Sequence, residues 1–251
     1  VIKEKNSTGF LVEAEGNTYA GKNLIIATGS SNVIPPLPGV SENLGTFVLT
    51  NREVLELQEI PKEFVVIGGG VIGLEMACYF ASVGVKVTVI EMMNKIAGPT
   101  DGDISKILQK NYEKKGITFL LSHKCLSVEP GTVWAEAPNG EKIAVAADKV
   151  LLSIGRRANI QGIGLENIGV LTERGAIVTN DKLETNVSGV WAAGDVNGKV
   201  MLAHTAYREG EVAVSDMLGK KDAVDYRSIP SVIYTNPEVG VVGETVESAK
   251  K

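Results

Sequence analysis

The segment from Phe64 to Glu91 constrains the fold more than any other part of the chain. An apolar run, a glycine-rich turn, an apolar helical stretch and a second apolar run follow one another as FVVI, GGGVIG, LEMACYFASVG and KVTVIE. This order predicts strand, turn, helix and strand, with an acid closing the second strand. A lone G-x-G-x-x-G pattern carries little information, but its place between a strand and a helix makes a dinucleotide-binding unit the favoured interpretation.

Each glycine of the turn has its own predicted task. Gly68 permits the tight turn after the strand, Gly70 leaves room for a pyrophosphate beside the backbone, and Gly73 lets the helix pack close to the strand. The N–H groups at the helix start and the helix dipole favour an anion there. The residues of this turn predicted to belong to the nucleotide site are Gly68, Gly69, Gly70, Val71, Ile72 and Gly73.

Glu91 follows Gly68 by 23 positions, close to the spacing expected for the ribose-binding acid of such a unit. Its carboxylate can accept hydrogen bonds from both hydroxyls of an adenosine ribose and would repel a 2′-phosphate. No arginine follows it in residues 92–94. We therefore predict NAD over NADP. The alternative is a glycine-rich turn in an α/β domain that binds no ligand.

Composition sets the outer limits. The 251 residues suggest one to three domains, and 44% hydrophobic residues suffice for a buried core. The net charge of −5 and the lack of a Lys/Arg cluster argue against nucleic-acid binding. No apolar run is long enough to cross a membrane and no signal peptide is recognisable, while the start at Val1 indicates a fragment of a longer chain. Two cysteines, Cys78 and Cys125, are too few for a disulfide framework and indicate a cytoplasmic protein.

The residues before this unit predict strands and a short helix. Residues 9–20 favour a hairpin, and residues 23–27 favour a strand buried on both faces that ends in Thr28-Gly29-Ser30. Thr50 to Glu53 resembles a capping box that opens a short helix.

The residues after Glu91 continue the alternation of helices and strands. Thr100 or Asp101 is expected to cap an amphipathic helix ending near Lys114, with an apolar face made of Ile104, Ile107, Leu108 and Tyr112. Strands around a turn at 138–141 predict an antiparallel insertion, and residues 149–154 predict a buried strand ending at Gly155. A further buried strand ends at Asp195, and a helix runs from residue 202 to about 218.

Several of these motifs, in this order, resemble the flavin-dependent pyridine-nucleotide–disulfide oxidoreductases, and within them the members that oxidise dihydrolipoamide. The resemblance runs through the whole chain and rests on ATGS at 27–30, the turn at 68–75, GRR at 155–157, AGD at 193–195, MLAH at 201–204 and YTNPEVG at 234–240. It implies a Rossmann-type parallel sheet with an antiparallel β insertion for NAD, and an incomplete FAD-binding domain of the same type. The implied domains are FAD-binding at 1–50 and 158–228, NAD-binding at 51–157, and the start of a truncated interface domain at 229–251.

The resemblance also implies roles for individual residues. Gly155, Glu75 and a backbone group of Cys125 join the glycine turn and Glu91 at the NAD site, and Glu75 also supports the flavin side by pairing with a lysine that this chain lacks. For FAD, the implied contacts are Thr28, Gly29, Ser30 and Asp195, together with a helix start at Met201, Leu202, Ala203 and His204 that faces the flavin. His123 is expected on the surface.

The sequence departs from that family in two respects that bear on function. The first glycine fingerprint for FAD and the closely spaced redox cysteines are absent, and Cys78 and Cys125 lie 47 residues apart. We therefore expect the longer protein to be a homodimer that takes electrons from protein-bound dihydrolipoamide, carried on the lipoyl domain of a 2-oxoacid dehydrogenase or glycine cleavage complex, through a cysteine pair and FAD to NAD. The chain itself is expected to be limited to nucleotide binding.

Two other interpretations remain open. One is a different NADH-using flavin disulfide reductase of the same family. The other is a nucleotide-binding module without flavin and without a redox role; the second small-residue turn, at Gly194-Asp195, argues against it.

Overall fold

The computed structural model describes residues 1–250, which form two compact units. Unit 1 consists of residues 1–31 and 156–229, and unit 2 consists of residues 32–155 together with the chain from Pro230 onward. Each unit is described by itself.

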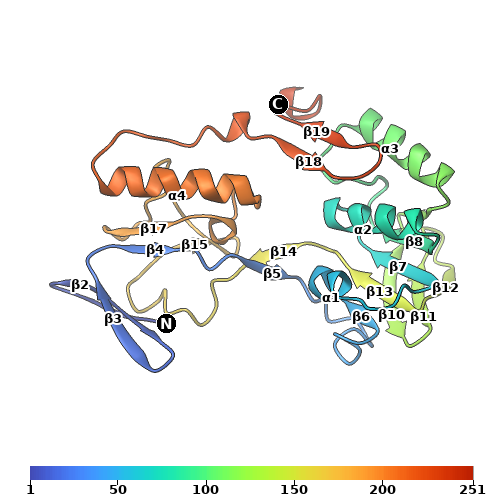
Figure 1. The fold of residues 1–251 in the computed structure, drawn as a ribbon, viewed down its shortest axis with the longest axis horizontal. Helices are drawn as coiled ribbons and strands as arrows, with labels where there is room; N and C mark the ends of the chain where they lie inside the picture. The colour runs from blue at the N-terminus through green and yellow to red at the C-terminus, as the bar shows by residue number, and fades with distance from the viewer. Residues whose placement is uncertain (251) are drawn as a thin grey trace. The chain divides into compact units, whose positions relative to one another are not determined.

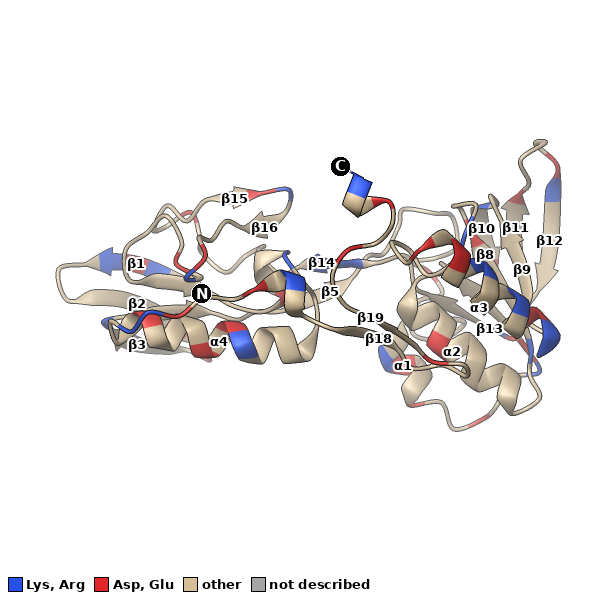
Figure 2. Cartoon of the chain, turned by 90° about the horizontal axis from the view of Figure 1, so that it is seen from above, with Lys and Arg blue, Asp and Glu red and all other residues tan. Residues whose placement is uncertain are grey.

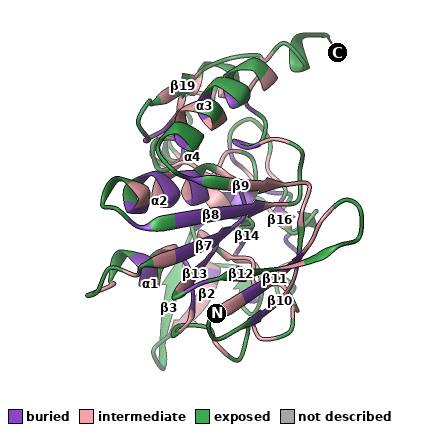
Figure 3. Cartoon of the chain, turned by 90° about the vertical axis from the view of Figure 1, so that its right-hand side faces the viewer, coloured by how far each residue is buried: buried purple, intermediate pink, exposed green. Residues whose placement is uncertain are grey.

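Unit 2 is built on a five-stranded, fully parallel sheet (Figure 1). Its strands are, in spatial order, β6 (Val48–Leu49), β13 (Lys149–Leu152), β7 (Glu63–Ile67), β8 (Lys86–Glu91) and β9 (Thr118–Leu121). The middle strands β13, β7 and β8 are almost entirely buried (Figure 3), because the sheet is covered on both faces. The predicted α/β fold with a parallel sheet is confirmed.

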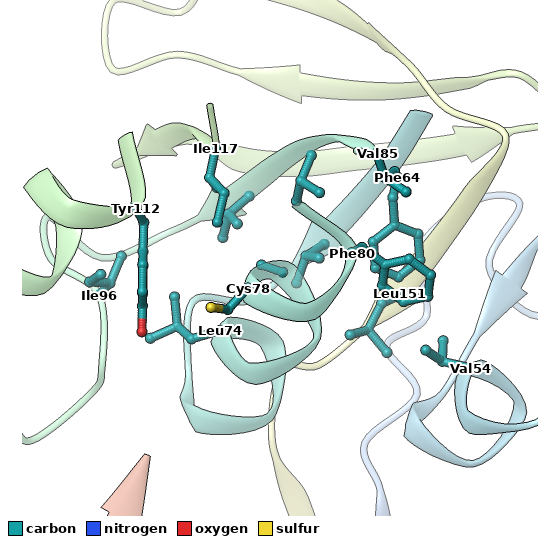
Figure 4. Packing of buried hydrophobic residues seen from close by; sticks show 14 of the residues in the cluster. Val54, Phe64, Leu74, Cys78, Phe80, Val85, Ile96, Tyr112, Ile117 and Leu151 are labelled. Carbon is teal, nitrogen blue, oxygen red and sulfur yellow. The ribbon is translucent and has the colours of Figure 1, made fainter. Parts of the chain in front are cut away.

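Different elements cover the two faces of this sheet. Helices α1 (Asn51–Leu55), α2 (Val71–Ser82) and α3 (Gly102–Lys114) pack on the side where Phe64 and Val66 point, and Figure 4 shows this core. The antiparallel strands β10 (Lys124–Glu129), β11 (Thr132–Glu136) and β12 (Lys142–Ala146) cover the side where Val65 and Ile67 point. The alternation of side chains along β7 thus supplies both cores.

Helix α3 differs from its sequence prediction in the face that it buries. Ser105, Leu108 and Tyr112 are buried, whereas Ile104 is 40% exposed and Ile107 is 56% exposed. The helix begins after Asp101 and ends at Lys114, as expected, and charged residues of both signs occur along it (Figure 2). Periodicity predicted the helix correctly, but its buried stripe is rotated toward Ser105, whose hydroxyl donates to the Ile96 carbonyl at 2.8 Å.

The two compact units group two segments differently from the predicted FAD, NAD and interface domains. Residues 32–50 lie with unit 2 rather than with the first FAD segment, because β6 pairs with β13 in the parallel sheet. The residues from Pro230 onward also group with unit 2. There β18 (Ser231–Ile233) and β19 (Val239–Val241) form a hairpin, and Ile233 is buried in the same cluster as residues of α2. A 3₁₀ helix, Ser248–Lys250, follows.

Unit 1 contains a short parallel pair and several small sheets. Strand β4 (Leu24–Ile26) pairs in parallel with β17 (Val190–Ala192), and α4 (Ala203–Met217) lies beside β17 (Figure 1). Trp191 of β17 is buried in one cluster with Val212 and Ala213 of α4. The remaining elements are β1 (Ile2–Asn6), β2 (Gly9–Ala14), β3 (Asn17–Gly21), β5 (Ser30–Asn32) with β14 (Arg156–Ala158), β15 (Thr172–Glu173) with β16 (Ala176–Ile177), and 3₁₀ helices at Asp195–Asn197 and Tyr226–Ser228.

Strand β4 is not buried on both faces as its sequence predicts. Ile26 is 4% exposed, but Ile25 is 40% exposed. In the parallel pair Ile25 lies beside Trp191, on the face where α4 packs; Trp191 belongs to the buried cluster there, whereas Ile25 does not.

Candidate functional site

The glycine turn between β7 and α2 has the geometry that its sequence predicts. Gly68 has a φ of +106°, and a Cβ there would lie 2.2 Å from the carbonyl oxygen of Ser153. A Cβ on Gly73 would lie 2.2 Å from the carbonyl oxygen of Gly68. Both glycines are therefore required by close backbone contacts inside unit 2, independently of any ligand.

Gly70 is different, because a Cβ there would meet no atom within 4 Å. It is the N-cap residue of α2, and no side chain caps this helix start. Open space thus faces uncapped N–H groups, which is the arrangement that a pyrophosphate needs.

Glu91 at the end of β8 holds this turn in place. Its Oε2 accepts the N–H of Gly69 at 2.6 Å, and its Oε1 accepts the N–H of Met93 at 2.6 Å. The carboxylate is therefore fixed by two backbone donors, and its remaining lone pairs are available to ribose hydroxyls.

A cavity of about 750 Å³ lies at the carboxyl ends of β7, β8 and β13. This edge is where open α/β sheets bind ligands. It brings together seven residues predicted for the NAD site: Gly68, Gly70, Val71, Ile72, Glu91, Cys125 and Gly155. Gly69 and Gly73 are buried beneath the turn and do not line it.

Several cavity residues were not recognised from the sequence. His123, expected on the surface, lines the cavity, and its Nδ1 lies 2.7 Å from the Leu121 carbonyl oxygen. Lys95 and Lys124 also line it, and Lys95 Nζ donates to the Thr100 carbonyl at 2.6 Å. His123 and Lys124 come shortly after the parallel strand β9, and Lys95 lies in the loop after β8. A position just beyond the carboxyl end of a parallel strand is the sequence signal that could have identified them as cavity residues.

The two cysteines are buried in clusters on opposite faces of the sheet. Cys78 of α2 packs near Leu74 and Tyr112 on the helical side, and its sulfur is visible there in Figure 4. Cys125 packs on the side of the antiparallel insertion, where burial raises the pKa of its thiol to about 11. The sheet separates the two thiols.

Glu75 lies in the second turn of α2, outside the residues that line the cavity. Its Oε1 accepts the backbone N–H of Tyr234 at 2.9 Å. The Sγ of Cys78, one turn further along α2, accepts the N–H of Asn236 at 3.5 Å. The segment after Pro230 is thereby attached to α2.

In unit 1, four of the residues predicted for FAD, Thr28, Gly29, Ser30 and Asp195, take part in two sets of hydrogen bonds. The Ser30 hydroxyl donates to Asp195 Oδ2, and Arg156 Nε donates to the same hydroxyl at 2.7 Å. Arg156 Nε also lies 3.9 Å from Asp195 Oδ2. Thr28 donates to the Asn159 carbonyl at 2.7 Å, and the Asn159 N–H donates to the carbonyl of Gly29 at 2.9 Å.

The predicted helix start is present in α4, which begins at Ala203 after the N-cap residue Leu202. Ala203 and His204 are exposed in its first turn. A second cavity, of about 590 Å³, includes Met201 and Lys199 with Arg156 and Arg157. Within residues 1–250 no cluster of His, Cys, Asp and Glu could hold a metal ion, and none of the helices described is long and apolar enough to cross a membrane.

A family profile described as pyridine nucleotide-disulphide oxidoreductase matches residues 1–210. The chain belongs to this family. FAD and NAD are the cofactors of the family, as the resemblance implied. Over 96% of its length the chain is 42% identical to a mitochondrial dihydrolipoyl dehydrogenase from Pisum sativum, and over 94% it is 41% identical to a dihydrolipoyl dehydrogenase from Bacillus subtilis.

The chain spans about half the length of these curated relatives, 48% and 50% respectively. Two solved structures are also similar to this chain. The HOCl-induced flavoprotein disulfide reductase RclA from Escherichia coli, as a Cu(II) complex, has a TM-score of 0.87 at 27% identity, covering 99% of this chain and 57% of that one. LpdA from Mycobacterium tuberculosis has a TM-score of 0.86 at 26% identity, covering 99% and 56%.

Proposed function

We propose that this chain is the nucleotide-binding part of an FAD-dependent dihydrolipoyl dehydrogenase. The whole protein passes electrons from protein-bound dihydrolipoamide through a cysteine pair and FAD to NAD. The chain described here is limited to binding the nucleotides, since its two cysteines lie on opposite faces of a sheet. The observation that carries the proposal is the open space at Gly70 beside the cavity that contains Glu91.

At the NAD site each residue has a task that its geometry permits. Uncapped N–H groups at the start of α2 bind the pyrophosphate at Gly70. Glu91, held by Gly69 and Met93, accepts from the adenosine ribose and repels a 2′-phosphate. Cys125 contributes through its backbone, because its side chain is buried in the cluster on the side of the antiparallel insertion.

At the flavin site, Asp195 accepts from a flavin-side hydroxyl, and Thr28, Gly29 and Ser30 pack against the cofactor. Met201, Leu202, Ala203 and His204 present the N-terminus of α4, whose dipole stabilises negative charge on the flavin. Bound FAD supplies two-electron redox chemistry by accepting and donating hydride. Glu75 supports the flavin side in the whole protein.

The cellular setting belongs to the same proposal. The whole protein is a cytoplasmic homodimer that serves the lipoyl domain of a 2-oxoacid dehydrogenase or glycine cleavage complex. The 42% and 41% identities to dihydrolipoyl dehydrogenases support dihydrolipoamide as the electron donor in this assignment.

The test is a pair of titrations on the purified chain. NADH binding, followed by fluorescence, is expected to exceed NADPH binding by about tenfold or more, the discrimination expected from a charged group placed against a phosphate. Glu91→Gln keeps the size of the side chain and removes its charge, so it is expected to narrow this difference. Equal affinity of the wild-type chain for NADH and NADPH would contradict the assignment of Glu91.

The second titration uses FAD. Flavin absorbance that survives gel filtration supports the flavin site in unit 1. A chain that binds NADH but retains no flavin would mean that it is an NAD-binding fragment and that unit 1 does not hold FAD by itself.

A further inference from the structure

Glu209 is a fully buried carboxylate in the middle of α4, and the mechanism above does not use it. A buried carboxylate is costly unless donors surround it. Its Oε2 accepts the N–H of Gly194 at 2.5 Å and the side-chain amide of Asn197 at 2.8 Å, and its Oε1 accepts the Tyr226 hydroxyl at 2.7 Å. All three contacts are donors, as a carboxylate requires.

Two of these three donors lie on either side of Asp195. Gly194 precedes Asp195, and Asn197 ends the short 3₁₀ helix that Asp195 begins. The turn is closed by the N–H of Asn197, which donates to the Gly194 carbonyl at 3.1 Å. A single oxygen of Glu209 therefore holds both ends of the turn that carries Asp195.

The Gly194–Asn197 turn packs closely against α4, and its position therefore depends on that helix. Gly194 has a φ of +79°, and a Cβ there would lie 3.2 Å from the Cβ of Ala206 in the first turns of α4. On the outer side, Asp195 contacts the Ser30 hydroxyl and Arg156. The inner contact to Glu209 and the outer contact to Ser30 together define where the Asp195 carboxylate points.

We propose that Glu209 is a positioning residue for the flavin, acting through the Gly194–Asn197 turn that presents Asp195. The inference rests on the proposed flavin site. In this proposal Glu209 does not need to touch FAD; it fixes the position of Asp195, which does.

The third donor extends this hold to another segment. Tyr226 lies in the 3₁₀ helix that precedes the end of unit 1. Burial, and then its hydrogen bond to Glu209, raise the pKa of Tyr226 above its usual range. The hydroxyl therefore stays protonated and donates to Glu209 throughout the neutral and mildly alkaline range.

The test compares Glu209→Ala, Glu209→Gln and a matched control, Glu211→Ala, in the full chain. Glu211 lies two residues further along α4 and its side chain is 69% exposed. Glu209→Ala is expected to weaken FAD binding about tenfold or more, the loss expected when hydrogen bonds to a buried charge are removed. Glu209→Gln is expected to bind nearly as the wild type, because Oε1 can accept from Gly194 and Asn197 while the Tyr226 hydroxyl turns to accept from Nε2.

Two readouts separate positioning from stability. The visible circular dichroism of bound flavin is expected to change in Glu209→Ala, and exchange of the Gly194 amide, followed by NMR without flavin, is expected to accelerate. Wild-type FAD affinity and flavin dichroism in a Glu209→Ala chain whose melting temperature has fallen would overturn the inference. If Glu209→Ala does not fold, Asn197→Ala removes one of the two bonds to the turn and is expected to weaken FAD binding severalfold; unchanged affinity would overturn the inference equally.

A failure of the proposed function gives a different pattern. If the wild-type chain binds no FAD, the proposal that this chain holds FAD is refuted, and the flavin role of Glu209 in this chain with it. The hydrogen exchange of the Gly194 amide in Glu209→Ala, measured without flavin, then still decides whether Glu209 holds the turn.

Discussion

The Glu75 carboxylate of α2 accepts the backbone N–H of Tyr234 at 2.9 Å, joining residues 159 positions apart in the chain. Tyr234 itself is 72% exposed, so the contact is made by its backbone and not by its ring. The segment after Pro230 thus depends on a side chain of the nucleotide-binding helix. In the proposed whole protein the same side chain supports the flavin side.

Removing this carboxylate is expected to loosen the segment. Glu75→Ala leaves the Tyr234 N–H without its acceptor, so its hydrogen exchange is expected to accelerate about tenfold, the effect of losing a hydrogen bond to a charged group. Glu75→Gln retains an acceptor oxygen and serves as the control. Wild-type exchange at Tyr234 in Glu75→Ala would show that β18 and β19 hold the segment without Glu75.

The glycine turn allows stability to be separated from ligand binding. Gly68→Ala places a methyl group 2.2 Å from the Ser153 carbonyl oxygen at a φ of +106°. It is expected to lower the free energy of unfolding by about 3 kcal/mol, at the upper end of ordinary substitutions. Urea denaturation measures this loss.

Gly70→Ala is the matched substitution two residues later. Its φ of −77° suits alanine, and no atom lies within 4 Å of the new Cβ. We expect wild-type stability but NAD binding weakened at least about tenfold, because the methyl group occupies the space of the pyrophosphate. Wild-type NAD affinity in Gly70→Ala would place the phosphate elsewhere.

Asp148 is expected to make the stability of unit 2 depend on acid pH. The N–H groups of Glu63 and Lys62 donate to its Oδ2 at 3.0 Å and 2.8 Å, and they hold the pKa of its carboxyl below the usual 3.8. The contribution of this carboxylate is complete above the unfolded pKa near 3.8 and is lost as the pH falls through the lower folded pKa.

Asp148→Asn keeps an acceptor oxygen and removes the charge, so it isolates this effect. The difference in urea midpoint between wild type and Asp148→Asn is expected at pH 7 and should disappear as the acid transition is crossed. If the urea midpoints of the two chains differ by the same amount at pH 7 and below the acid transition, the charge of Asp148 has no part in stability.

Cys125 is expected to give an alkaline limit of stability. Its folded pKa of about 11 exceeds the unfolded value of 9.0, because burial disfavours the thiolate. Ionisation therefore favours the unfolded chain above pH 9, and stability is expected to decrease as the pH rises from 9 toward 11.

Thiol alkylation of a Cys78→Ala chain measures the same property directly. At pH 8 the folded chain is expected to react far more slowly than the chain in urea, since only the thiolate is nucleophilic. Cys125→Val in the same background is the control for reaction at other groups. Equal rates for folded and unfolded chains would show that Cys125 is accessible.

The local units of unit 2 could be predicted from sequence because they depend on neighbours in the chain. The order of strand, glycine turn, helix and acid from Phe64 to Glu91 predicts β7, α2 and β8, and the capping box at Thr50 is present, with Thr50 N–H donating to Glu53 at 2.8 Å. The close contacts of Gly68 and Gly73 are likewise consequences of a strand turning into a helix.

Other features were decided by tertiary contacts. The rotation of α3 follows from Ser105 bonding to Ile96, and the place of residues 32–50 follows from the pairing of β6 with β13. Neither contact leaves a periodic signal in the sequence. Ile96 lies in a loop, and β6 has only two residues.

The sequence by itself determined the family, the parallel α/β fold and the position of the nucleotide-binding turn, since spacing and backbone geometry are local. Only the tertiary structure placed His123 in the cavity, tied Glu75 to Tyr234 and surrounded the Glu209 carboxylate with three donors. Hydrogen bonds between distant segments depend on how whole elements pack, and packing is a property of the folded chain rather than of any stretch within it.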